Sequence, residues 1–152
     1  MRRIDPGERW GDVIADSEAT ADAFRERDWT AIAAHPGDVN PVTDATRLDV
    51  LLPGSEFDAA NEAVGDAAID TVRVYAASAD GVEYRLVVAE DADAAIAVCV
   101  PTYLGAAEFD ALREAVGADG TLTVRLRPLD DRDVVEIEMT DPDVFFEPES
   151  DA

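Results

Sequence analysis

Two ten-residue stretches, EFDAANEAVG at 56–65 and EFDALREAVG at 108–117, decide how this chain is organised. They lie 52 residues apart and are identical at eight of ten positions. The same offset places Thr71-Val72-Arg73 on Thr123-Val124-Arg125, so 11 of the 19 positions from 56 to 74 match their counterparts. A self-match of this extent within one chain indicates an internal repeat.

Each copy of the repeat has the pattern of a strand, a helix and a pair of strands. In the first copy, an apolar strand at 48–52 precedes a helix at 55–64, with Ser55 as its N-cap. Strands at 71–78 and 82–89 follow, joined by a hairpin turn at Ala79-Asp80-Gly81. In the second copy, a strand at 95–100 ends at Pro101, and a helix at 108–116 and strands at 122–127 and 134–139 follow. The two copies span residues 48–93 and 95–143.

The segments outside the repeat are predicted to be a helix, a short strand and two irregular stretches. Apolar residues at three-and-four spacing predict an amphipathic helix over 8–28, namely Trp10, Val13, Ile14, Ala21 and Phe24. An apolar run at 29–34 predicts a short strand, and the prolines within 36–47 predict an irregular connection. Near the C-terminus we expect Phe145 and Phe146 to dock on the core, and residues 147–152 to fray.

These elements predict a single α+β domain over residues 1–152. Neither copy could bury the apolar face of its strands alone, so the copies should share one mixed, mostly antiparallel sheet of six or seven strands. Two equivalent helices would then cover one face of this sheet, related by an approximate twofold axis. The N-terminal helix would pack on the assembled unit.

Acidic residues dominate the charge of the chain. It carries 35 Asp and Glu against 12 basic residues, a net charge of −23, and every basic residue is arginine. At low ionic strength these like charges repel and loosen the compact state, whereas at 1 M salt the Debye length falls to ~3 Å. The acids are scattered between apolar residues, which indicates a solvated surface and not a disordered tail. The composition therefore predicts a protein adapted to concentrated salt and surrounded by many counter-ions.

The same composition argues against several classes of protein. Direct binding of nucleic acid is disfavoured by the acidity, although high salt weakens the repulsion. Neither a run of 18 apolar residues nor an apolar N-terminal stretch is present, so we expect no membrane span, no signal peptide and a cytoplasmic location. The single cysteine, Cys99, excludes an internal disulfide, and the lack of Cys and His clusters argues against a metal site. No cofactor is implied.

The alternation along the hairpin strands predicts a polar sheet face. Seven charged side chains are assigned to it: Arg73, Arg85, Arg125, Arg127, Glu83, Glu136 and Glu138. Cross-strand ion pairs explain this pattern and would contribute about 0.2–1 kcal/mol each, less in high salt. The alternative is an arginine platform that binds an anionic ligand or an acidic partner.

Three further features are candidates for function, and each has a simpler structural explanation. The strand-to-helix turns at 53–55 and 101–105 offer backbone N–H groups to an anion, but capping and turn geometry explain them. Tyr103 in the longer turn is expected to be an exposed contact residue. We expect His35 to be a turn residue or hydrogen-bond anchor, and Cys99 to be inert packing within an apolar run. No nucleophile, base and orienting group form a recognisable pattern.

Three segments of the chain resemble a known family. They are the stretch from Trp10 to Asp38, the Leu48–Gly54 segment with its D-V-L-L-P-G, and Asp141–Phe146. Together they are similar to a family of small acidic haloarchaeal proteins with no assigned function. The resemblance covers most of the chain and implies a haloarchaeal origin and a cytoplasmic location. It supplies no activity and no site residues.

The sequence favours a non-catalytic interaction or regulatory module, either a homo-oligomer or bound to a protein partner, over an enzyme. The missing catalytic groups and the pseudo-symmetric sheet are the basis of this hypothesis. The alternative is a small-ligand-binding regulatory domain that uses the strand-to-helix turns or a groove between the two copies. The expected binding residues are Arg73, Arg85, Arg125, Arg127 and Tyr103.

Overall fold

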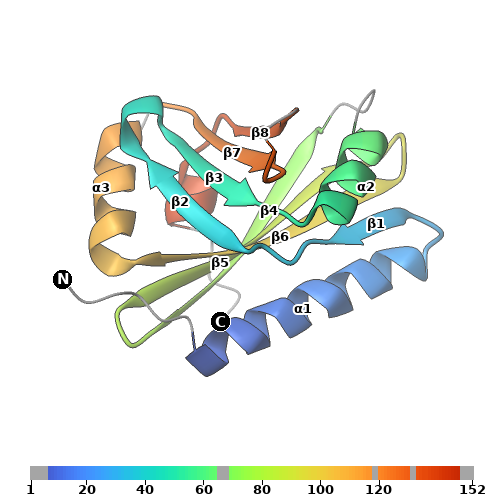
Figure 1. Ribbon diagram of the computed structural model, residues 1–152, viewed down its shortest axis with the longest axis horizontal. Coiled ribbons are helices and arrows are strands. Elements are labelled where there is room, and N and C mark those ends of the chain that lie inside the picture. Colours follow the sequence, from blue (N-terminus) through green and yellow to red (C-terminus); the bar gives the residue numbers. More distant parts are fainter. Residues whose placement is uncertain (1–6, 65–68, 118–119, 131–132, 148–152) are drawn as a thin grey trace.

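The computed structural model describes residues 7–64, 69–117, 120–130 and 133–147, which form two four-stranded sheets with helices around them (Figure 1). In chain order the elements are α1 (Gly7–Arg25), β1 (Thr30–Ala33), β2 (Asp38–Val42), the 3-10 helix η1 (Thr43–Ala45), β3 (Arg47–Leu51), α2 (Gly54–Val64), β4 (Thr71–Ala79), β5 (Val82–Asp91), β6 (Ile96–Gly105), α3 (Ala106–Val116), β7 (Leu122–Arg127), β8 (Val135–Met139) and α4 (Asp143–Phe146).

The strands are divided between two mixed sheets. Sheet A has the strand order β1-β6-β5-β4, and sheet B has the order β2-β3-β7-β8. In each sheet one pair is parallel, β1 with β6 and β3 with β7, and the other neighbours are antiparallel. The α+β class predicted from the sequence is confirmed. The strands form two sheets, however, in place of the single sheet of six or seven strands that we expected.

The order strand, helix, strand, strand occurs twice along the chain, as β3-α2-β4-β5 and as β6-α3-β7-β8. Each half gives its first strand to the hairpin of the other half, so β3 pairs with β7 and β6 pairs with β5. The first of these pairings is parallel and the second is antiparallel. The two sheets are therefore not equivalent, and the simple twofold arrangement expected from the repeat does not describe them.

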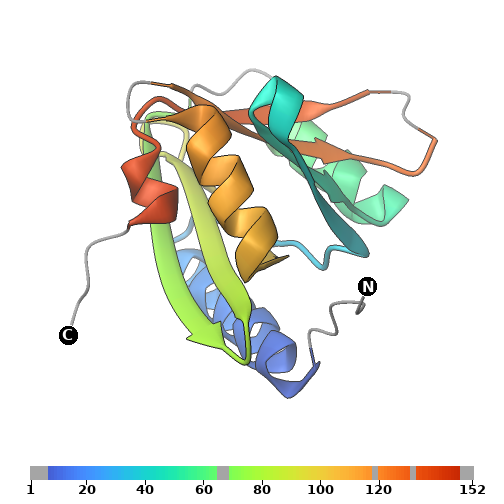
Figure 2. The ribbon, with the colours of Figure 1, turned by 90° about the vertical axis from the view of Figure 1, so that its left-hand side faces the viewer.

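The main core lies between the sheets. Its fully buried side chains come from both sheets and from the helices, and include Val50, Phe57, Val87, Leu112 and Leu126. Helices α2 and α3 close the two ends of the space between the sheets (Figure 1, Figure 2). A second, smaller core lies on the opposite face of sheet A, where α1 packs on β1, β5 and β6. β5 is therefore buried on both faces.

Two strands lie where the sequence predicted irregular chain. β2 occupies 38–42 and contains Pro41, but it is the edge strand of sheet B, a position where proline is tolerated. β6 does not end at Pro101 and continues to Gly105. The neighbouring strand β1 ends at Ala33, opposite Cys99. Pro101 therefore has no residue of β1 opposite it, and its missing N–H costs no hydrogen bond between these strands.

The other local predictions agree with the structure only in part. The hairpin turn at Asp80-Gly81 has positive φ at both residues, 54° and 80°, as a tight two-residue turn requires. Phe145 and Phe146 are buried on α4. Helix α2 begins at Gly54, so Ser55 lies inside its first turn and is not the N-cap. Apart from Glu147, the C-terminal residues expected to fray lie outside the described part of the chain.

Candidate functional site

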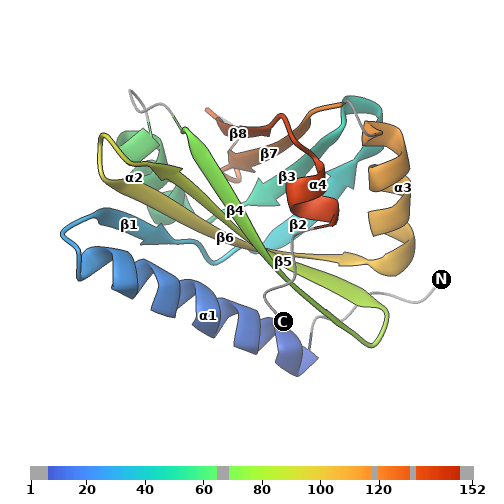
Figure 3. The ribbon, with the colours of Figure 1, turned by 180° about the vertical axis from the view of Figure 1, so that it is seen from behind.

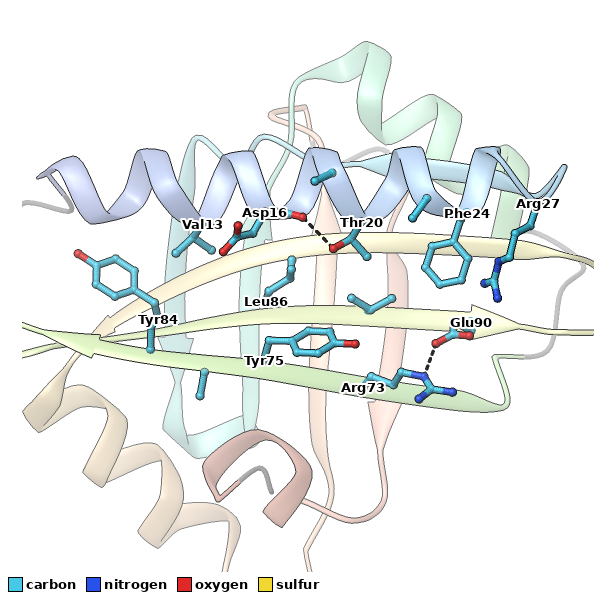
Figure 4. A pocket seen from close by; sticks show the side chains of 15 residues that line it. Val13, Asp16, Thr20, Phe24, Arg27, Arg73, Tyr75, Tyr84, Leu86 and Glu90 are labelled. Carbon is cyan, nitrogen blue, oxygen red and sulfur yellow. Dashed lines mark hydrogen bonds and ion pairs between the residues drawn. The ribbon is translucent and has the colours of Figure 1, made fainter. Parts of the chain in front are cut away.

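A groove of about 710 Å³ runs between α1 and the β4–β5 hairpin (Figure 4). Its volume falls within the range of small-molecule binding sites, about 300–1,000 Å³. The groove arises because α1 covers only part of sheet A. The helix packs on β1, β6 and the near side of β5, and the same face of β4 stays open.

The floor of the groove is apolar and comes from β5. Tyr84, Leu86 and Val88 point to this face because alternate residues of a strand share a side. The register of the hairpin then fixes the neighbours on β4: Arg73 lies opposite Val88, and Tyr75 opposite Leu86. The β4–β5 hairpin thus supplies a hydrophobic surface bordered by one aromatic ring and one guanidinium group.

The wall of the groove is the flank of α1. Its apolar positions, including Val13 and Phe24, reach down to the sheet, while Asp16, Thr20 and Ala23 line the upper part. Small side chains on this flank keep the groove wide. The Thr20 hydroxyl donates to the carbonyl oxygen of Asp16 at 2.8 Å, so it is already occupied within the helix.

Two arginines lie at one end of the groove (Figure 4). Arg73 donates from Nε to Oε2 of Glu90 at 2.8 Å, and the side chain of Glu90 is 9% exposed against 61% for Arg73. Arg27 stacks its guanidinium over the ring of Phe24, 4.8 Å from the centroid, and over the ring of Trp29 at 5.0 Å. Among the residues that the structure describes, no carboxylate pairs with Arg27. Its donors are therefore available to an anion.

This arrangement joins an apolar floor to a cationic end. The Arg73 guanidinium uses one donor on Glu90 and has further donors in its planar fork. Glu90 holds Arg73 in place, while the aromatic rings hold Arg27. A ligand with an apolar body and a terminal carboxylate would match both parts of the groove.

A second hollow, of about 630 Å³, has the opposite character. It lies beside β8 and is lined by Asp70, Glu136, Glu138 and Asp141 together with apolar side chains. Crowded carboxylates disfavour an anionic ligand there. Within the described ranges, no three His, Cys, Asp or Glu side chains are arranged to hold a metal ion.

The structure separates the arginines that were assigned to one sheet face. Of the predicted binding residues, only Arg73 lies in the groove. Arg85 is on β5 of the same sheet but points to the opposite face. Arg85 lies opposite Ala76 of β4, and Ala76 and Arg73 are three residues apart on that strand, so their side chains point to opposite faces. Assigning Arg73 and Arg85 to a common face was wrong. The assignment failed because β5 has buried residues on both sides, so its alternation does not mark a solvent face.

Arg85 is a structural residue. It is 5% exposed and donates from Nε to the carbonyl oxygen of Phe145 at 2.7 Å and from Nη1 to that of Tyr84 at 3.0 Å. Its guanidinium lies 4.6 Å from the ring centroid of Phe109 and 3.2 Å from the Glu83 carboxylate. Burial lowers the pKa of Arg85, and the Glu83 carboxylate partly opposes this effect. These contacts fasten α4 to sheet A and leave Arg85 unavailable to a ligand.

Arg125 and Arg127 lie on the outer face of sheet B, far from the groove in the fold. Arg125 is opposite Glu136 in the register of the β7–β8 pair, but no ion pair joins the two side chains, and the buried Nε of Arg125 has no hydrogen-bond partner among the described residues. On the neighbouring strand β3, Arg47 donates from Nε to Asp49 at 2.7 Å, and this hydrogen bond raises the pKa of Arg47. This sheet face carries alternating charges of both signs, and its arginines are not gathered into one anion site.

Tyr103 is not an exposed loop residue, contrary to expectation. Because β6 continues to Gly105, Tyr103 lies within a strand and is half-buried. Its ring packs edge-on against Trp10 of α1, with the centroids 4.9 Å apart. The contact helps to fix the N-terminal part of α1 on sheet A.

His35 and Cys99 both have structural partners. The His35 backbone N–H donates to Oε1 of Glu56 at 2.6 Å, and Nδ1 lies 2.7 Å from Oε2 of the same side chain. His35 is thus the hydrogen-bond anchor that the sequence predicted, linking the chain before β2 to α2. Cys99 is fully buried beneath α1. Neither residue lines the groove.

The buried thiol leads to a prediction about pH. Burial raises the pKa of Cys99 to about 12 from its ordinary value of 9. Cys99 should therefore not react with a thiol reagent at pH 8 in the folded protein, and should react at once after unfolding. Above pH 9 the Cys99 thiol ionises in the unfolded chain but not in the folded protein. Cys99 therefore lowers the free energy of unfolding progressively as the pH rises toward 12. Labelling with a chromogenic disulfide, with and without denaturant, measures the effect, and rapid labelling of the native protein would contradict it.

Sequence reasoning missed the groove because α1 lies outside the repeat. Nothing in the local pattern shows which part of a sheet a helix leaves uncovered. One signal was available: Tyr75 is a large ring in a strand otherwise rich in small residues, and it is 49% exposed. Arg27, between Phe24 and Trp29, was a second signal, because aromatic neighbours position a guanidinium.

The fold is a two-sheet α+β domain with an open, amphipathic groove on one sheet. None of the described helices is long and apolar enough to cross a membrane. The chain belongs to DUF7529, a family of unknown function, whose model matches residues 4–147. No curated protein and no solved structure matches the chain.

Proposed function

We propose that this protein is a non-catalytic binding module, and that the groove beside α1 takes up a small organic anion with an apolar body. The observation that carries the proposal is the pair of guanidinium groups, Arg27 and Arg73, at one end of an apolar floor. In a chain with a net charge of −23, two arginines beside one hollow are unusual, and of the two carboxylates in the lining Glu90 is already paired with Arg73 while Asp16 lies on the flank of α1. The groove replaces the binding places expected from the sequence, which were the strand-to-helix turns and a groove between the repeats.

The residues with nucleophilic or acid–base chemistry support a non-catalytic role. The thiol of Cys99 is buried and stays protonated near neutral pH. The imidazole of His35 is held by Glu56, outside the groove. Binding of a ligand, without chemical change, is the activity that the groove residues favour. We further propose that the protein acts in a salt-rich cytoplasm, as its composition suggests.

Binding of octanoate tests the proposal, with octanamide as its uncharged counterpart. Titration calorimetry in about 2 M KCl should show octanoate binding more tightly, and Arg27→Gln should weaken octanoate about tenfold while leaving octanamide unchanged. Arg27 suits this test because its loss leaves no buried carboxylate unpaired. Equal binding of the two compounds by the wild-type protein would show that the arginines do not recognise the carboxylate.

A second pair of variants tests the place of binding. Ala19→Phe introduces a ring into the groove from the exposed flank of α1 and should abolish octanoate binding. Ala15→Phe places the same ring on an exposed position of α1 that does not line the groove, and should bind like the wild-type protein. Equal loss of binding in both variants, or in neither, would place the ligand elsewhere.

A further inference from the structure

The four outer strands of the two sheets differ in how they are protected against pairing. β1 has only four residues, β2 contains Pro41, and β8 carries the exposed Glu136 and Glu138. These are the usual devices that keep a sheet edge from pairing with another chain. β4 lacks these three devices: it has nine residues with neither proline nor acid, and its one charged side chain, Arg73, is held by Glu90. Figure 3 shows β4 at the margin of sheet A.

The absence of acids from β4 stands out in this chain. Asp and Glu make up 35 of the 152 residues, yet 71–79 contains none. The other acid-free runs of nine or more residues are 29–37, 94–107 and 120–129. They hold β1, which lies beneath α1, and the interior strands β6 and β7. The strands within these runs are thus mostly covered, whereas Tyr75, Ala76, Ala77 and Ser78 of the acid-free strand β4 are exposed.

The hairpin fixes which backbone groups of β4 are free. In a two-residue hairpin the residues that flank the turn, here Ala79 and Val82, form a hydrogen-bonded pair. Every second residue from Ala79 backwards therefore bonds to β5, including Ala77 and Tyr75. The residues between them, Val74, Ala76 and Ser78 among them, direct their N–H and C=O groups away from the sheet.

We propose that two copies of this chain pair antiparallel through β4, about a twofold axis at Tyr75. In this register Thr71 of one copy lies opposite Ala79 of the other, so all nine residues pair. Tyr75 faces its own counterpart at a non-hydrogen-bonded position, where side chains are closest. Arg73 lies opposite Ala77, so no like charges meet, and the absence of acids lets two strongly negative molecules approach at this edge.

Self-pairing suits β4 better than pairing with another strand of this composition. A strand with the usual share of acids would bring several carboxylates to an edge whose single cation, Arg73, is already paired with Glu90. An isologous contact uses the same patch twice, so one acid-free edge is sufficient. The product is a continuous eight-stranded sheet that carries both α1 helices on one face, with the two grooves open toward each other and Tyr75 between them.

Cysteine cross-linking tests the register in about 2 M KCl. Tyr75→Cys should form an intermolecular disulfide on mild oxidation, because opposed non-hydrogen-bonded positions have Cα atoms about 4.5 Å apart. Ala77→Cys is the control: in the same register the two copies of residue 77 are about 14 Å apart, and it should not cross-link. The native Cys99 is buried and does not compete. Equal cross-linking of both variants would overturn the register.

A proline variant tests the pairing itself. Ala76→Pro removes an outward N–H and leaves the bonds to β5 intact, so it should convert the dimer to a monomer in sedimentation velocity. Ala76→Ser keeps the N–H and should remain dimeric. Circular dichroism checks that both variants fold. A monomeric wild-type protein at high concentration in 2 M KCl, or a dimeric Ala76→Pro, would overturn the proposal. Both experiments are independent of what the groove binds.

Discussion

Replacing Arg85 with alanine is expected to lower the free energy of unfolding by about 3 kcal/mol. The side chain is almost fully buried and donates hydrogen bonds to the carbonyl oxygens of Tyr84 and Phe145. Its loss leaves those acceptors without their charged donor, leaves Glu83 without its cation and opens a cavity against Phe109. Urea unfolding in concentrated KCl, followed by circular dichroism, measures the change.

Arg113→Ala is the matched control for this prediction. Arg113 also donates to α4, from Nη2 to the carbonyl oxygen of Phe146 at 2.9 Å, and it also lies over the ring of Phe109. Its side chain is 43% exposed, so water replaces the lost hydrogen bond. We expect a loss below about 1 kcal/mol. Equal losses for the two arginines would show that burial of the guanidinium is not the source of the stability.

The second large effect is expected from salt. Raising KCl from about 10 mM to about 2 M shortens the Debye length from ~30 Å to below ~3 Å, so repulsion among the surface carboxylates largely disappears. For a net charge of −23, we expect the melting midpoint to rise by at least about 10 °C. In a chain of this size that rise corresponds to about 3–5 kcal/mol. Thermal melts followed by circular dichroism measure it.

A melt in sucrose at matched osmolality distinguishes the screening of charges by salt from the general stabilisation that any solute excluded from the protein surface produces. Sucrose favours the compact state but does not screen charge, so it should restore only a small part of the effect. If the midpoints in dilute buffer and in KCl were equal, the acidity would have to serve another purpose. Acidic mimicry of a polyanion would then become the leading explanation of the composition.

Local elements of this fold could be predicted from the sequence, because they depend on nearby residues. The helical stripe of α1 and the turn at Asp80-Gly81 are examples. The division into two sheets could not, because it depends on which distant strands pair. Pro101 appeared to end a strand, since only the structure shows that β1 stops before reaching it.

The candidate site was harder to predict than the fold. Arg73, one of the predicted binding residues, lines the groove. Arg85 is also an arginine in a regular strand, but its side chain is buried and holds α4 in place. The difference comes from the C-terminal α4, whose carbonyl oxygens reach Arg85 from 60 residues further along the chain. Arg27 was overlooked because a charged residue at the end of an amphipathic helix normally faces water.

The exchange of first strands between the two halves has a kinetic and thermodynamic consequence. Each sheet contains strands from both halves, so neither half retains a complete sheet if the other one melts. Unfolding should therefore be all-or-none, with no surviving half-molecule. Folding is expected to be slow, because the pairing of β3 with β7 requires closure of a loop of more than 70 residues before the contact forms. Slow, strictly cooperative folding is thus built into the connectivity of the strands.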